Sequence, residues 1–464
     1  MDERNQANAI PPEEEIPPWD RLSDLIQAGD SEAIEQFVDA LPLGEIARIL
    51  SRLDEEDRGR FLQILPPETV AEILEQIPEV QAVDLIEQLD HDVAAAILNE
   101  LPSDEQADLI GDLEDQDAEA ILREMEPEES RDARALSRYE DDVAGGLMIT
   151  EYLSYPESAT VADVVNDLRR NAEEYQDYHV QYAYVTTTGG RLAGVLQLRE
   201  LFLSADAKRI SDLMIRDPRT VPDQAGLEEL EDLFDRYPFF GLPVVDAHGR
   251  LVGVVQRESV DEAVAERAGS DYRKSQGIVG GEELRTMPLF LRSRRRLSWL
   301  SVNILLNVIA ASVIAFYQDT LASVIALAVF LPIISDMSGC SGNQAVAVSM
   351  RELTLGVVKP AEVALVWGKE VLVGLVNGMA LGALIGLVAW LWKGNVFLGL
   401  VVGGAMAVNT IVAVSIGGTI PLILKRLEMD PALASGPILT TITDMCGFFV
   451  VLSLATVLLP YLTG

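Results

Sequence analysis

The sequence predicts a multidomain protein. An acidic soluble half, made of an all-α helical solenoid and an α/β pair of modules, should precede a connecting helix and a five-helix α transmembrane domain. Three observations predict this. Residues 1–296 hold 66 of the 74 acidic and 29 of the 35 basic residues. The remaining part of the chain consists mostly of long apolar stretches. The soluble half contains two different internal repeats, each typical of its own fold.

A repeat of 24 residues runs from residue 41 to residue 136. An Ile-Leu pair recurs at the same place in each of its four units, which begin at Leu41, Leu65, Leu89 and Leu113. One such unit cannot bury its apolar stripe alone, so the units should stack as pairs of short helices. We therefore expect a helical N domain over residues 1–136. Asp108 and Asp112 share one face of a helix there, which is either a solvated face or part of a cation site.

A second, longer repeat occupies residues 137–266. Residues 184–195 resemble residues 244–254, and each copy reads as a strand, a Gly-Arg turn and a second strand between two helices. This looks like a tandem pair of CBS modules, which pack into one α/β unit and commonly sense small ligands.

The nucleotide-binding form of such modules tends to have a Thr after the second strand and an Asp three residues later. The matching places in this chain hold Gln197 and Glu200, and then Gln256 and Ser259. ATP binding to the CBS pair is therefore left open. The chain contains no P-loop motif, so it is not itself a P-loop pump.

Five apolar stretches follow Arg296. Each is long enough to cross the hydrocarbon layer of a bilayer, which takes about 20 helical residues. They run over residues 297–317, 321–348, 361–392, 396–424 and 432–462. Basic residues gather before the first stretch, after the second and after the fourth, so the positive-inside rule places the soluble half in the cytoplasm and the C-terminus outside. Residues 1–19 carry no apolar signal core, which agrees with a multi-pass protein of the cell membrane.

Polar side chains interrupt these apolar stretches. Asp336 and Asp444 lie inside the second and the fifth, where a charge is costly and is therefore usually functional. Asn343, Asn409 and Thr440 add amide and hydroxyl groups. All of these are hard oxygen donors, whereas the three scattered His and two Cys provide no imidazole or thiolate cluster. Such a donor set suits Mg²⁺ or Ca²⁺ better than zinc or copper.

Composition argues against several classes of function. A net charge of −39 argues against nucleic-acid binding, which needs a basic face. The two cysteines rule out a disulfide scaffold. The spans contain no nucleophile–base pair, so the protein is not expected to be an enzyme. Two alternatives stay open: a transporter of another divalent cation such as Ca²⁺ or Co²⁺, and a membrane-anchored divalent sensor, although a sensor would not need polar groups inside its spans.

Taken together, this order of parts resembles the MgtE family of magnesium channels and transporters. The motifs that carry the resemblance are residues 144–148, 294–300, 342–344, 430–432 and 440–447. The resemblance implies Mg²⁺ uptake by a homodimer whose pore lies on the two-fold axis. It places the central pore carboxylate at Asp444 and an acid at the cytoplasmic end of the fifth span at Asp430. Cys340 stands where members of the family often carry Asn.

The resemblance also implies that cytosolic Mg²⁺ closes the pore by bridging acids of the N domain, the CBS pair and the connecting (plug) helix, residues 267–296. Asp271 matches an acid of the plug helix. A soluble half with a net charge of −37 must repel itself, and divalent cations would relieve the repulsion. The acids that could meet around such ions are Asp108, Asp112, Asp223, Asp246, Asp271, Glu282 and Glu283.

Overall fold

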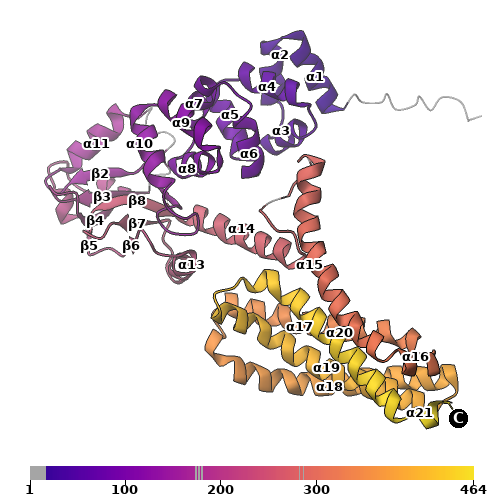
Figure 1. Cartoon of the computed structure of the whole chain (residues 1–464). Coiled ribbons are helices and arrows are strands. Elements are labelled where there is room, and N and C mark those ends of the chain that lie inside the picture. The colour runs from indigo at the N-terminus through magenta and orange to yellow at the C-terminus, as the bar shows by residue number, and fades with distance from the viewer. Residues whose placement is uncertain are drawn as a thin grey trace, which may run out of the picture. The chain divides into compact units, whose positions relative to one another are not determined.

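The computed structural model describes residues 17–463, apart from residues 173, 174, 176, 177, 179, 180, 282 and 286. The chain divides into two compact units, residues 1–266 and residues 267–464, and each is described by itself. Figure 1 shows the first unit as a row of short helices that leads into a mixed α/β part, and the second as a bundle of long helices.

Between residues 17 and 136, ten short helices form the N domain (Figure 1). Each 24-residue unit is one pair of helices, as the repeat predicts, and another pair precedes the first unit. The Ile-Leu pairs are buried in all four units, so each pair packs its apolar stripe against its neighbours. The helices are α1 (Pro18–Ala28), α2 (Ser31–Asp39), α3 (Leu43–Leu50), α4 (Glu55–Ile64), α5 (Pro67–Leu74), α6 (Glu79–Ile86), α7 (His91–Leu98), α8 (Ser103–Asp112), α9 (Asp115–Glu124) and α10 (Pro127–Leu136).

Two four-stranded sheets form the CBS pair, with strand orders β2-β3-β4-β5 and β1-β8-β7-β6. Their strands are β1 (Met148–Ile149), β2 (Leu153–Pro156), β3 (Tyr182–Thr186), β4 (Leu192–Gln197), β5 (Ile215–Arg216), β6 (Val221–Pro222), β7 (Gly241–Val245) and β8 (Leu251–Gln256). The helices between them are α11 (Val161–Arg170), α12 (Leu198–Phe202), the 3-10 turn η1 (Ile210–Asp212) and α13 (Leu227–Arg236). Each copy pairs its two long strands in the same antiparallel register, which confirms the repeat.

The two CBS copies exchange their opening strands. Strand β1 comes before the first copy but pairs with β8 of the second, while β5 pairs with β4 of the first. Glycine makes the exchange possible, because a Cβ at Gly253 would lie 2.5 Å from the Met148 sulfur and one at Gly194 would lie 2.6 Å from the Met214 sulfur. The exchange joins the two copies into one α/β body.

The last helices of the solenoid share a hydrophobic core with the second CBS copy. Ala107 of α8 and Leu136 of α10 pack in the same buried cluster as Met148. The contact is also polar, since the Ser103 hydroxyl donates to Glu151 (2.8 Å) and Ser103 N–H donates to the other oxygen of that carboxylate (3.1 Å). The N domain and the CBS pair therefore belong to one unit: each keeps a core of its own, and this shared cluster joins them across residue 136.

Within its described residues, the second unit contains five helices of 27 residues or more: α15 (Leu289–Phe316), α17 (Leu327–Thr354), α18 (Val363–Lys393), α19 (Val396–Arg426) and α20 (Pro431–Val457). The short elements α16 (Gln318–Ser323), η2 (Pro360–Glu362) and α21 (Leu459–Thr463) lie between or after them. Helix α19 is the most buried of the apolar ones. Glycines let α18 approach it closely, because a Cβ at Gly378 would lie 2.6 Å from the Ala407 carbonyl oxygen.

Four helices of the described chain are long and apolar enough to cross a membrane: Leu289–Phe316, Pro360–Lys393, Val396–Arg426 and Gly436–Val457. Helix α17, the second of the five expected spans, is not among them. Its 28 residues would suffice in length, but the Ser, Asp, Gly, Asn and Gln residues between residues 335 and 344 lower its hydropathy. Among the described residues, the expected count of five spans and the observed count of four therefore differ at α17.

Helix α14 (Arg257–Ser275) follows directly from strand β8 and runs into the connecting segment. The first membrane helix starts at Leu289, eight residues before the predicted start of the first span, so the arginine cluster forms its first turns.

Candidate ion pathway and acidic cytoplasmic residues

Asp444 lies midway along α20, among apolar helices. Its side chain is almost completely buried, with 9% exposure, and the Ser335 hydroxyl of α17 donates to its Oδ1 atom. A carboxylate inside a membrane bundle is costly unless polar neighbours compensate, and Ser335 is such a neighbour. The structure therefore brings together two of the helices on which the sequence predicts pore residues.

A polar face runs along the outside of α17. Asp336, Cys340 and Asn343 are spaced four and three residues apart, and all three are exposed. Thr440 of α20 is exposed as well, although its hydroxyl donates to the Gly436 carbonyl oxygen (3.0 Å). Lipid cannot satisfy such groups, so this face needs water, ions or another polar surface against it.

Asn409 does not lie on that face. It is completely buried within the bundle, and its amide nitrogen lies close to Gly447, where a Cβ would come within 2.7 Å. Neither amide atom of Asn409 nor the hydroxyl of the neighbouring Thr410 has a hydrogen-bond partner within the described chain. The sequence shows that these groups are polar and intramembrane, but it does not show that they point into the protein interior.

Asp430 precedes α20 by one residue. Its Oδ1 atom accepts a hydrogen bond from the Ala432 N–H (2.8 Å) and caps the helix, while the Lys274 ammonium of α14 lies 3.1 Å from its Oδ2 atom. Sequence reasoning missed Lys274, because a lysine beside Arg273 in a helix of mixed charge gives no sign of its partner.

Helix α8 carries a dense group of acids on one side. Asp108 and Asp112 were expected there, and the structure adds Asp104 and Glu105, which the same three- and four-residue spacing could have revealed. The pKa of Glu105 is raised to about 8, mainly by burial and further by repulsion from the Glu75 carboxylate. Burial likewise raises the pKa of Asp108 to about 8, with further repulsion from acids on neighbouring elements.

The remaining acids of α8 are perturbed in the same direction. Burial raises the pKa of Asp104 to about 6, although Ser259 of α14 donates to its carboxylate (3.4 Å). Burial and then the charge of Asp141 raise the pKa of Asp112. Carboxylates packed this closely without a cation repel each other, so a divalent ion would relieve strain at this face.

The two CBS acids are engaged by their own module. The Tyr139 hydroxyl donates to Asp223 (3.2 Å), and burial and the nearby charges of Asp223 and Asp246 raise the pKa of that hydroxyl. Asp246 accepts hydrogen bonds from the N–H groups of His248 and Arg250 and from the Arg250 side chain. These hydrogen bonds lower the pKa of Asp246 to about 2, and the one from the Arg250 N–H contributes most. Asp246 therefore stays ionised within the turn between β7 and β8.

The connecting segment contains the other three predicted acids. Asp271 is partly exposed on α14. Glu282 lies outside the described residues. The Glu283 side chain is only 3% exposed, and its pKa is lowered first by the hydrogen bond from Arg296 and then by Arg292. Across the described ranges, no three His, Cys, Asp or Glu side chains converge as a ready-made metal site.

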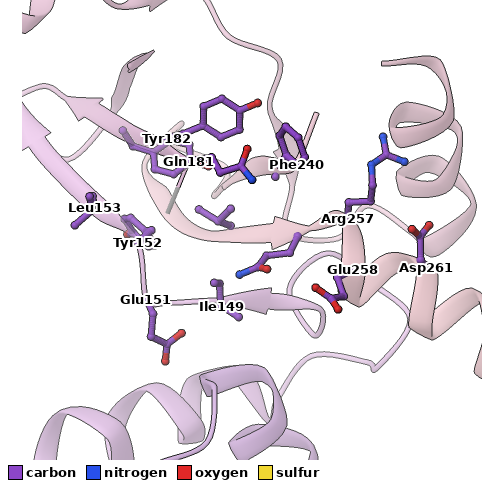
Figure 2. Close-up of a pocket in the computed structure, with 14 residues that line it drawn as sticks. Ile149, Glu151, Tyr152, Leu153, Gln181, Tyr182, Phe240, Arg257, Glu258 and Asp261 are labelled. Atoms are coloured by element: carbon purple, nitrogen blue, oxygen red, sulfur yellow. The ribbon is translucent and has the colours of Figure 1, made fainter. Parts of the chain in front are cut away.

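A cleft of about 400 Å³ lies between the two CBS copies (Figure 2). Tyr152, Tyr182 and Phe240 line it, with Glu258 and Asp261 at one end. Arg257 is the only Lys or Arg among its described lining residues, and the guanidinium already donates to the carbonyl oxygens of residues 234, 237 and 239. This cleft therefore offers aromatic surface and carboxylates, but no uncommitted cation for a phosphate.

Known proteins match most of the chain. A sequence model described as a divalent cation transporter, MgtE, matches residues 331–454; a model of the MgtE intracellular N domain matches residues 41–142, and a CBS-domain model matches residues 210–266. The magnesium transporter MgtE of Bacillus subtilis (strain 168) is 32% identical over 328 residues, which are 70% of this chain and 72% of that protein. The magnesium transporter MgtE of Thermus thermophilus is 34% identical over 333 residues, 71% and 72% of the two chains. The chain belongs to the MgtE family.

Membership of the MgtE family makes the chain a membrane transporter of divalent cations, and confirms the resemblance seen in the sequence. The transporter model covers α17 to α20 almost completely, and so includes Asp336 and Asp444. Among solved structures, a crystal structure of the cytosolic domain of the Mg²⁺ channel MgtE in complex with ATP is 32% identical. It covers 52% of this chain and 98% of that chain, with a TM-score of 0.48.

Proposed function

We propose that the chain is a Mg²⁺-selective channel or transporter for magnesium uptake across the cell membrane. The observation that carries the proposal is the position of Asp444. Its carboxylate lies midway along a membrane helix and accepts a hydrogen bond from the Ser335 hydroxyl. Helix α17 provides both Ser335 and the exposed polar face formed by Asp336, Cys340 and Asn343. Mg²⁺ gives up its water reluctantly, so a sparse row of oxygen atoms suits a hydrated ion. The names of the relatives as magnesium transporters favour Mg²⁺ over Ca²⁺ or Co²⁺.

The working form in this proposal is a homodimer, with the soluble half in the cytoplasm and the C-terminus outside. The face formed by Asp336, Cys340 and Asn343 is exposed in one protomer. A second copy would bring an equal face opposite it and enclose a polar passage, which removes the cost of exposing these groups to lipid.

Regulation by cytosolic Mg²⁺ is the second part of the proposal. The crowded acids of α8 support it, because an ion shared between them and acids of other elements would stabilise the compact soluble half. ATP has no assigned place in this proposal, since Arg257 in the CBS cleft is committed to backbone carbonyls.

Flux of Mg²⁺ into proteoliposomes tests the pore assignment. Both Asp444→Ala and Asp444→Asn should reduce it to near background in protein that folds and inserts, because each removes the central negative charge. Asp319→Asn, which neutralises an exposed acid of α16 at the end of the bundle, is the control and should transport normally. Normal flux through Asp444→Ala would disprove the assignment, and equal rates for Ca²⁺, Co²⁺ and Mg²⁺ would disprove the selectivity.

A further inference from the structure

We propose that Lys274 is a tethered cation that occupies the Asp430 carboxylate, so that Mg²⁺ must displace its ammonium group to bind there. The inference rests on the proposed function, because Asp430 stands at the start of the helix that carries Asp444. One carboxylate oxygen, Oδ1, is taken by the Ala432 N–H (2.8 Å). The other, Oδ2, lies 3.1 Å from the Lys274 nitrogen. A cation arriving at the Oδ2 side therefore meets an ammonium group already in place.

The position of Lys274 is fixed by the turn that follows it. Helix α14 ends at Ser275, and Gly277 adopts a left-handed conformation with φ of 80° and donates its N–H to the Lys274 carbonyl oxygen (2.9 Å). The indole of Trp299 on α15 packs directly on Gly277, where no Cβ would fit. Lys274 thus sits in the last turn of a helix whose end is held against a membrane helix.

A second contact ties the same segment down. The Glu283 carboxylate is buried and paired with Arg292 and Arg296 in the first turns of α15. The chain between α14 and α15 is therefore held against α15 at two points, by Gly277 and by Glu283. Because Lys274 is held in place by this short segment, its ammonium group has a high effective concentration at Asp430. The ion pair can therefore form even though its own interaction energy is small.

The competition has a definite direction. The ammonium and carboxylate groups are 41% and 36% exposed, so the pair is partly screened and a divalent ion can displace it. Removing the ammonium should let Mg²⁺ bind at a lower concentration. From the range typical of exposed ion pairs, the concentration for half-maximal flux should fall about two- to fivefold.

The test uses the full chain in proteoliposomes and measures the initial rate of Mg²⁺ flux from the cytoplasmic side at low concentrations. Lys274→Gln should lower the half-maximal concentration, whereas Lys274→Arg should retain the wild-type value. Lys425→Gln removes the same charge from an exposed position near the end of α19, and it should have no such effect. In an Asp430→Asn background, Lys274→Gln should change nothing further, because the carboxylate for which it competes is gone.

Each outcome has a separate meaning. An equal effect of Lys274→Gln with and without the Asp430 carboxylate would show that Lys274 acts through packing, and would overturn the inference. An effect of Lys274→Gln no larger than that of Lys425→Gln would also overturn it. Asp444→Ala in the same assay reports on the proposed function alone: if it abolishes flux while the Lys274 variants behave as wild type, only the tethered-cation inference fails.

Discussion

Two polar residues of the membrane half, Asp444 and Asn409, have similar sequence surroundings but different surroundings in the structure. Asp444 and Asn409 look alike in the sequence, since each is a polar residue inside an apolar stretch. The structure places Asp444 against Ser335 of α17, but it packs Asn409 in the interior against Gly447. Residue type and depth identify both as exceptional, while helix rotation decides which side chains each of them contacts.

Gly447 is required by this packing. In Gly447→Ala the new Cβ would lie 2.7 Å from the Asn409 amide nitrogen and 3.2 Å from its Cγ atom, so the buried amide must shift. The bundle should lose about 1–3 kcal/mol of stability, which thermal unfolding of the detergent-solubilised protein would measure. Adding Asn409→Ala should recover most of the loss.

Gly339→Ala is the matched control, because a Cβ there meets nothing within 4 Å. It should leave the unfolding temperature unchanged. A Gly447→Ala protein as stable as the wild type would mean that Asn409 and Gly447 are not packed as described.

At the level of the element, α8 combines a structural and an electrostatic role. Its apolar side joins the core shared with the CBS pair, and its acidic side holds Asp104, Glu105, Asp108 and Asp112. The spacing of acids along α8 is visible in the sequence. The crowding is not, because it arises from Glu75, Asp141 and other acids that come from separate elements.

This crowding predicts a pH dependence for the soluble unit. Glu105 and Asp108 have pKa values of about 8 in the folded unit, far above the ordinary values of 4.5 and 3.8. The folded state thus binds protons that the unfolded chain releases, so stability should fall as pH rises from about 4 to about 8. Chemical denaturation of fragment 1–266 in EDTA should show lower stability at pH 8.5 than at pH 6.

Millimolar-range Mg²⁺ should restore the stability at pH 8.5, since a shared divalent ion replaces the protons, while Na⁺ of equal ionic strength should do much less. The double variant Glu105→Gln/Asp108→Asn should flatten the pH dependence. Asp115→Asn/Glu124→Gln, which neutralises two exposed acids of α9, should not. If Mg²⁺ stabilised the fragment no more than Na⁺ does, these acids would form only a solvated surface and not a divalent-ion site.

The whole molecule is organised so that the N domain cannot be removed cleanly at residue 136. Deleting residues 1–136 would take away Ala107 and Leu136 and expose the second CBS copy around Met148. Deleting residues 1–101 keeps α8 to α10 and the Ser103–Glu151 contact. The shorter deletion is therefore the proper test of the regulatory role.

The protein lacking residues 1–101 should insert and transport Mg²⁺, but should close less completely when Mg²⁺ on the cytoplasmic side is high. Flux into proteoliposomes at low and high cytoplasmic-side Mg²⁺ would measure this difference. The protein lacking residues 1–136 serves as the comparison and should aggregate more on size-exclusion chromatography. A shorter-deletion protein that is inserted but inactive would contradict a purely regulatory N domain.

The sequence by itself determined the architecture, because periodicity and composition act locally. The 24-residue repeat predicted the helix pairs, the strand–Gly-Arg–strand repeat predicted the CBS copies, and the apolar runs predicted the membrane helices. It also marked Asp444, since a charge within an apolar stretch stands out. Only the tertiary structure decided which distant side chains meet. The burial of Asn409, the pairing of Glu283 with two arginines and the Lys274–Asp430 contact all depend on helix rotation and on chain turns. Those are set by packing over the whole unit, which no local pattern records.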